Sequence, residues 1–142
     1  MPWLLISLGA TWALIGLTWV VQLVVYPAFA NVGLAEFPAY HEQHCRRITW
    51  VVVPLMVMEL SSALALVFLT PSQLGTGLAW LALALCVLCW AVTALFAVPA
   101  HAALAKNRDG EVLRELLRAH WARTVAWTGR GILLAVVLAP SV

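Results

Sequence analysis

The stretch "AYHEQHCRRITWVVVPLMVMELSS" (residues 39–62) combines two kinds of sequence that rarely occur together. Its second half, from Ile48 onward, is almost entirely apolar and is typical of a helix that crosses a membrane. Its first half contains two histidines and two arginines, and one acidic residue, Glu59, lies inside the apolar half. Polar groups at membrane depth prefer the interior of a bundle, so this stretch predicts a helix that packs against other helices.

The composition of the chain indicates that most of it lies in lipid. Of its 142 residues, 64% are hydrophobic and 10% are charged, and the mean hydropathy is +0.97. A soluble domain of this size could not bury so many apolar side chains, because small domains expose much of their surface. Backbone polar groups in lipid must be satisfied within a helix. We therefore predict an all-α integral membrane four-helix bundle, one transmembrane domain over residues 1–142, with helices at about 3–26, 37–69, 75–99 and 110–139.

The distribution of charge predicts how the bundle is oriented. Basic residues gather around the first and third connections, whereas the second connection, "TPSQLGTG" (residues 70–77), carries no charge. The positive-inside rule then places the basic connections in the cytoplasm and both termini outside, which in a bacterium means a multi-pass protein of the inner membrane. The first apolar run lacks a basic leading region and a clear cleavage site, so we expect a membrane helix there rather than a signal peptide.

The formal net charge of +2 gives no reason to expect binding of nucleic acid. The basic residues flank the ends of the membrane segments, where contact with anionic lipid explains them.

The two halves of the chain resemble each other. "VVYPAFA" (residues 24–30) corresponds to "FAVPAHA" (residues 96–102), and His44-x-x-Arg47 corresponds to His120-x-x-Arg123. This pattern predicts two helical hairpins that run in the same direction through the membrane, as parallel repeats do.

All four histidines are expected at the cytoplasmic end, on the inward faces of their helices. Imidazole is the commonest transition-metal ligand, and metal sites in bundles are built from facing helices. The set suits Zn, Cu or Fe, and a haem b held by two histidines also fits. The alternative is that the histidines bind no metal and are hydrogen-bonded or hydrated near the lipid headgroups. The four candidate metal ligands are His41, His44, His101 and His120.

Other residues on the inward faces are candidates for roles around this pocket. Arg47 and Arg123 follow the histidines and can stabilise an anion, and Tyr26 can donate a proton. Trp90 and Trp127 lie on the same faces as His101 and His120, and are candidates for contact with a cofactor.

Glu59 and Arg130 are expected near the middle of the membrane. Ionisable residues there are functional candidates and are usually paired. One interpretation is a structural ion pair that fixes the register of the helices. The other is a catalytic, substrate-orienting or proton-handling role for one or both side chains.

The three cysteines are expected to be structural. Cys86 and Cys89 form a C-x-x-C inside an apolar run, where packing is the ordinary role of cysteine. Cys45 follows His44 directly, but neighbouring residues point about 100° apart around a helix.

Five motifs together resemble a group of small bacterial four-helix membrane proteins that is distantly similar to the anthrone oxygenase-like family. The motifs are "VVYPAF", "FPAYHEQHCRR", "VVPLMVMEL", "VPAHAAL" and "HWARTVAWTGRG". The resemblance implies oxidation of aromatic polyketides with dioxygen, with the four histidines and Arg123 as site residues.

The leading hypothesis is an oxygenase-like membrane oxidoreductase with a histidine-rich cytoplasmic-side pocket for a lipophilic substrate. A second hypothesis is a small oligomeric proton-coupled transporter that uses Glu59. A third is a non-enzymatic assembly or sensor subunit of the membrane. Glycine and alanine on the helices are compatible with a homo-oligomer.

Overall fold

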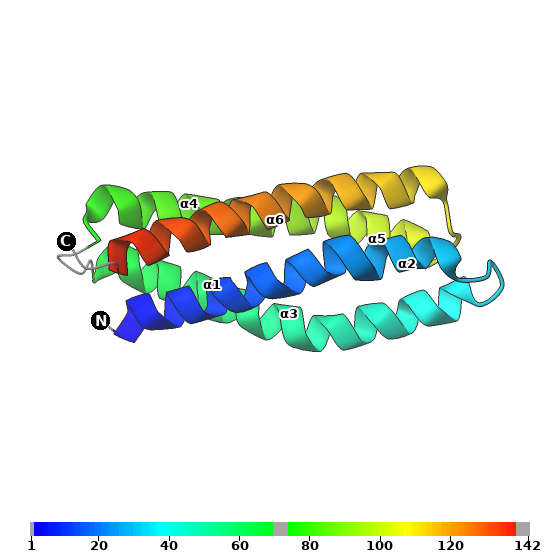
Figure 1. Ribbon diagram of the computed structural model, residues 1–142, viewed down its shortest axis with the longest axis horizontal. Helices are drawn as coiled ribbons and strands as arrows, with labels where there is room; N and C mark the ends of the chain where they lie inside the picture. Colours follow the sequence, from blue (N-terminus) through cyan, green and yellow to red (C-terminus); the bar gives the residue numbers. More distant parts are fainter. Residues whose placement is uncertain (1, 70–73, 139–142) are drawn as a thin grey trace.

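The computed structural model describes residues 2–69 and 74–138. Within these residues the chain forms four long helices and no strand, which confirms the all-α four-helix prediction. The four helices lie side by side along the long axis of the molecule (Figure 1). Pro2 and Leu138 lie at one end of this bundle, and the connections at 32–36 and 105–109 lie at the other.

The first and third long helices are each interrupted by one π turn. The first helix consists of α1 (Pro2–Val20), the π turn η1 (Val21–Val25), α2 (Tyr26–Ala28) and the 3-10 turn η2 (Phe29–Asn31). The third consists of α4 (Thr76–Val92), the π turn η3 (Thr93–Ala97) and α5 (Val98–Leu104).

Each π turn is followed by a proline, Pro27 or Pro99, at the start of the next α segment. A proline inside a helix lacks one N–H and clashes with the carbonyl one turn earlier. A π turn widens the helix locally, so it accommodates this proline and lets the helix continue. The third helix accordingly runs to Leu104, whereas the sequence predicts an end near residue 99.

The second and fourth helices are α3 (Phe37–Phe68), which is continuous through Pro54, and α6 (Gly110–Leu138). Arg108 fastens the connection before α6 to the end of the first helix. Its Nη1 donates hydrogen bonds to the carbonyls of Phe29, Ala30 and Val32, over 3.3, 2.8 and 2.7 Å. The last carbonyls of a helix have few partners within the helix, and Arg108 supplies a donor to them here.

Within the described residues, three helices are long and apolar enough to cross a membrane: Pro2–Asn31, Phe37–Phe68 and Thr76–Leu104. α6 is not among these three, since Arg123 and Arg130 lower the hydropathy of its apolar part. Both arginines are buried, and the outer face of α6 exposes Val125, Ile132 and Val136. Large apolar side chains are exposed on all four long helices, as expected of a surface in contact with lipid.

α1 packs closely against α6 at Gly131. A Cβ atom added to Gly131 would collide with Cδ1 of Ile15 and lie 3.6 Å from atoms of Thr11 and Trp12. A glycine at this position therefore lets the two helices approach, as small residues do in membrane bundles.

Candidate functional site

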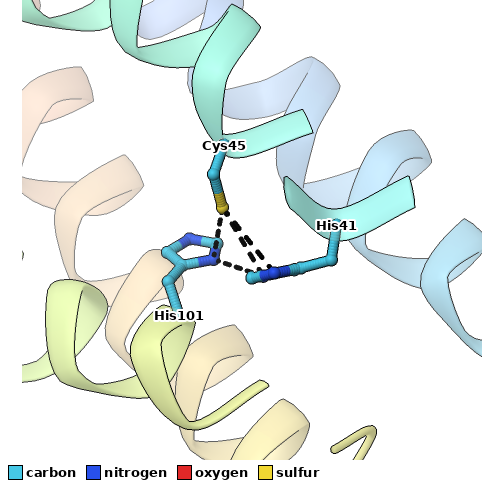
Figure 2. A group of neighbouring side chains, drawn as sticks. All are labelled: His41, Cys45 and His101. Atoms are coloured by element: carbon cyan, nitrogen blue, oxygen red, sulfur yellow. Dashed lines mark hydrogen bonds between the residues drawn. The ribbon is translucent and has the colours of Figure 1, made fainter. Parts of the chain in front are cut away.

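Three potential metal ligands meet at the end of the bundle that holds the connections. His41 and Cys45 lie one turn apart on α3, and His101 faces them from α5 (Figure 2). His41 Nε2 lies 3.0 Å from His101 Nδ1. Cys45 Sγ lies 3.6 Å from each of these two nitrogens. Two helices that are distant in the sequence thus bring two imidazoles and one thiol to a single point.

The two imidazoles are held by neighbours that fix their orientation. The hydroxyl oxygen of Tyr26 lies 3.1 Å from His101 Nε2, which leaves Nδ1 of that ring toward His41 and Cys45. The ring of His41 stacks on Phe37 with a centroid distance of 5.5 Å, and its side chain is 1% exposed. A hydrogen bond to the second ring nitrogen is the usual way in which proteins orient a ligating histidine.

The spacing of the three atoms fits one transition-metal ion. With bonds of about 2.0–2.1 Å to nitrogen and 2.3 Å to sulfur, tetrahedral coordination separates two nitrogens by about 3.3 Å and a nitrogen from a sulfur by about 3.5 Å. The observed separations of 3.0 and 3.6 Å need only small side-chain adjustments to reach those values. Two histidines and one cysteine suit Zn or Cu. Three protein ligands leave a coordination position open.

The other two histidines have different surroundings. His120 Nδ1 donates a hydrogen bond of 2.7 Å to Gln22 Oε1, so this nitrogen is already used. The ring centroid of His44 lies 6.3 Å from that of His101. The buried Nε2 of His44 has no hydrogen-bond partner in the described residues. The ring of Tyr26 packs against both of these histidines, at a centroid distance of 6.2 Å from His44 and 4.8 Å from His120. The four-histidine ligand set is therefore not assembled; His41 and His101 meet with Cys45 instead.

Cys45 belongs to the ligand cluster, although the sequence predicts only a structural role for it. That expectation compared Cys45 with His44, its neighbour in the sequence. The relevant partner is His41, because residues four apart lie on the same face of a helix. The spacing His41-x-x-x-Cys45 is visible in the sequence, whereas the approach of His101 needs the tertiary fold.

A cavity of about 380 Å³ adjoins the cluster. Its wall is mostly aliphatic, and both π turns contribute to it through Val21 of η1 and Thr93, Ala94 and Ala97 of η3. Two residues connect the cavity with the ligand cluster. His101 lines the cavity and is one of the three ligands, and Tyr26 lines the cavity and contacts His101. Its volume lies in the range of small-molecule sites. The other polar or aromatic lining residues include Trp90, His120 and Arg123.

The remaining candidates are distributed unevenly around this cavity. Arg123 and Trp90 line it, as a role near a ligand requires. Arg47 is exposed on α3 and lines a separate hollow with Tyr40 and His44. Trp127 is fully buried and does not line the cavity; its ring packs under the guanidinium of Arg123 at 5.1 Å.

Glu59 and Arg130 form a buried ion pair, with Arg130 Nη1 2.8 Å from Glu59 Oε1. Residues of all four long helices complete it. The second carboxylate oxygen accepts hydrogen bonds from Trp127 Nε1 at 2.9 Å and from the thiol of Cys86 at 3.7 Å.

The guanidinium of Arg130 is equally well supplied with partners. Its Nε donates to the carbonyl of Ala82 at 2.9 Å and its Nη2 donates to Ser7 at 2.7 Å. Thr11 bridges the pair, since it accepts from Arg130 Nη1 and donates to Glu59 Oε1. Neither Glu59 nor Arg130 lines the cavity beside His101. These contacts favour the structural interpretation, in which the pair fixes the register of the four helices.

Comparisons of the chain with known protein families, with curated proteins and with solved structures find no match.

Proposed function

We propose that this protein is a membrane-embedded oxidoreductase in which His41, Cys45 and His101 bind one transition-metal ion. The single observation that carries the proposal is the close triangle of His41 Nε2, His101 Nδ1 and Cys45 Sγ. Copper is the redox-active metal that such a ligand set favours, because imidazole and thiolate both suit it.

The surroundings of the triangle support a catalytic rather than a purely structural ion. Structural zinc sites are usually closed by four protein ligands, whereas catalytic sites keep a position open. Here the three ligands come with a hydrogen-bonded Tyr26 and an adjoining cavity. The resemblance to the anthrone oxygenase-like family supports dioxygen as the oxidant. A bound metal would supply the redox chemistry, while Tyr26 orients His101 and the cavity holds the substrate away from water.

The same proposal includes a location. We place the protein in a bacterial inner membrane as a four-span protein, with the connections at 32–36 and 105–109 on the cytoplasmic side. The basic residues near these two connections support this orientation. The metal site would then lie at the cytoplasmic end of the bundle, and the cavity would be reached from the bilayer.

The proposal is tested by purifying the protein without a histidine tag and determining its metal content. We expect one Cu or Zn ion per chain, and with Cu(II) a strong visible band from charge transfer between thiolate and copper. Cys45→Ala should abolish this band, and His101→Ala should reduce the metal content. Cys89→Ala is the matched control, because the buried thiol of Cys89 donates to the carbonyl of Arg123 and is not part of the ligand triangle.

Protein that stays free of metal after incubation with each ion would refute the proposal. So would a Cys45→Ala variant that binds metal with the spectrum and stoichiometry of the wild type. Retention of metal in the Cys89→Ala variant would show that the effect of Cys45→Ala is specific to the Cys45 thiol.

A further inference from the structure

The cavity contains a positive charge that the protein does not neutralise. The side chain of Arg123 is 6% exposed, and among the described residues it forms no ion pair and no hydrogen bond. Its guanidinium carbon lies 5.1 Å from the ring centroid of Trp127, which makes a cation–π contact. Arg130, on the same helix, is paired with Glu59 and hydrogen-bonded through all three nitrogens. Of the two buried arginines in the described residues, Arg123 is thus the one whose guanidinium has no polar partner.

A second residue that lines the cavity also has a buried donor without a partner among the described residues. Trp90 lines it together with Arg123, and the buried Nε1 of Trp90 has no acceptor in the part of the chain that the structure describes. No aspartate or glutamate is among the described residues that line the cavity. A buried charge without a partner is costly, and so is a buried N–H without an acceptor. Both costs are removed if a bound molecule brings an anionic oxygen to this place.

The cavity also indicates what the rest of such a molecule is. Aliphatic side chains make up most of the wall, including Leu17, Ile48 and Met56. Two further lining residues, Val53 and Val98, are 46% and 58% exposed, so the cavity reaches the apolar outer surface of the bundle. A ligand can therefore enter from lipid. The planar guanidinium of arginine matches a carboxylate, which accepts two parallel hydrogen bonds.

We propose that this cavity binds a lipid-soluble carboxylate, such as a long-chain fatty acid. The carboxylate accepts hydrogen bonds from Arg123 and Trp90, and the hydrocarbon chain lies along the aliphatic wall toward the bilayer. As an assignment of the substrate class, this inference rests on the proposed oxidoreductase function. Binding of the carboxylate itself needs no metal ion, because neither donor belongs to the ligand triangle.

The test is a binding assay with radiolabelled palmitate on metal-free protein in an uncharged detergent. We expect saturable binding that unlabelled palmitate displaces, while hexadecanol, which has the same chain length and no charge, does not displace it. Arg123→Gln should weaken binding by about 10- to 100-fold, the range for loss of hydrogen bonds to a charged group. Arg46→Gln is the matched control, because Arg46 is exposed on α3 and lines none of the cavities described above.

Two further variants keep the test decisive if Arg123→Gln does not fold. Arg123→Lys keeps the positive charge but loses the planar guanidinium that can donate two parallel hydrogen bonds. It should bind palmitate with an affinity between those of the wild type and Arg123→Gln. Trp90→Phe removes one donor and should weaken binding less than Arg123→Gln. Displacement by hexadecanol as effective as by palmitate would overturn the proposal, and so would wild-type affinity in a folded Arg123 variant.

The metal and the carboxylate can be tested independently of each other. Cys45→Ala should lose the metal and still bind palmitate, since Cys45 does not line the cavity. A wild-type protein that binds metal but no palmitate would overturn the carboxylate site and leave the oxidoreductase proposal intact. A wild-type protein that binds palmitate but takes up no metal ion when metal is offered would support the carboxylate site and refute the oxidoreductase proposal.

Discussion

Arg123 and Arg130 lie about two turns apart on α6 and are both buried, yet only Arg130 meets an acidic side chain. Arg130 ties α6 to Glu59 of α3, to Ser7 and Thr11 of α1 and to α4. The same residue type thus has two different effects on the stability of one helix. One guanidinium is part of the packed core, and the other faces a cavity.

Substitution of Arg130 should strongly destabilise the bundle. In Arg130→Met the carboxylate of Glu59 loses its counter-ion in the protein interior. Removal of one partner from a buried ion pair costs about 3–5 kcal/mol. The free energy of unfolding can be measured in mixed micelles with increasing SDS, followed by tryptophan fluorescence.

Arg123→Met is the matched control and should leave the free energy of unfolding unchanged or raise it, because no carboxylate loses a partner. The double variant Glu59→Leu/Arg130→Met should recover much of the stability that Arg130→Met loses, since it removes the unpaired charge as well. Equal losses in Arg123→Met and Arg130→Met would contradict the assignment of the ion pair as the stabilising element.

Much of the fold could be predicted from hydropathy and helical periodicity. Residues placed on the inward face of α6 by their spacing, among them His120 and Trp127, are buried in the structure. The pairing of Glu59 with Arg130 was one of two interpretations, and the structure shows it directly. The π turns could not be predicted, because one extra residue per turn leaves no mark in composition; only the prolines after them, Pro27 and Pro99, point to an irregularity.

The candidate site was harder to predict than the fold. Periodicity within α3 places His41 and Cys45 on one face, but their relation to His101 depends on how α5 lies after the π turn η3. A π turn shifts every later side chain around the helix axis, although Trp90 of α4 and His101 of α5 still line the same cavity, as a shared face predicts. The capture of His120 by Gln22 likewise depends on the packing of two helices and not on spacing within either.

Tyr26 should affect metal binding without touching the metal. Its hydroxyl lies 3.1 Å from His101 Nε2, the ring nitrogen that faces away from Cys45. Tyr26→Phe removes this contact and leaves the ring in place. Loss of such a partner typically lowers metal affinity by about 10- to 100-fold. Competition with a chelator of known affinity measures the change.

Tyr40→Phe is the control for Tyr26→Phe, because Tyr40 is the other tyrosine of the sequence and its side chain is exposed. The metal affinity of the Tyr40→Phe variant should equal that of the wild type. Unchanged affinity in Tyr26→Phe would show that packing alone orients His101.

The two glycines of the "TGRG" segment should respond differently to alanine. At Gly131 a methyl group would collide with Cδ1 of Ile15, so Gly131→Ala must displace that side chain or separate α1 from α6. We expect a loss of about 1–3 kcal/mol, the usual cost of overpacking. Nothing lies within 4 Å of a Cβ atom added to Gly129, and Gly129→Ala should stabilise α6 by about 0.5–1 kcal/mol. The same unfolding assay measures both, and equal effects would show that the Ile15 side chain moves aside without cost.

The proposed orientation can be tested at Lys106, the one lysine of the sequence, which is exposed in the connection at 105–109. If the basic connections face the cytoplasm, an amine reagent that cannot cross membranes should modify Lys106 in inverted membrane vesicles and not in intact cells. Mass spectrometry of the peptide that contains Lys106 measures the modification, and permeabilised cells give its maximum. Modification in intact cells that reaches this maximum would place the connection, and the ligand triangle near it, on the outer side of the membrane.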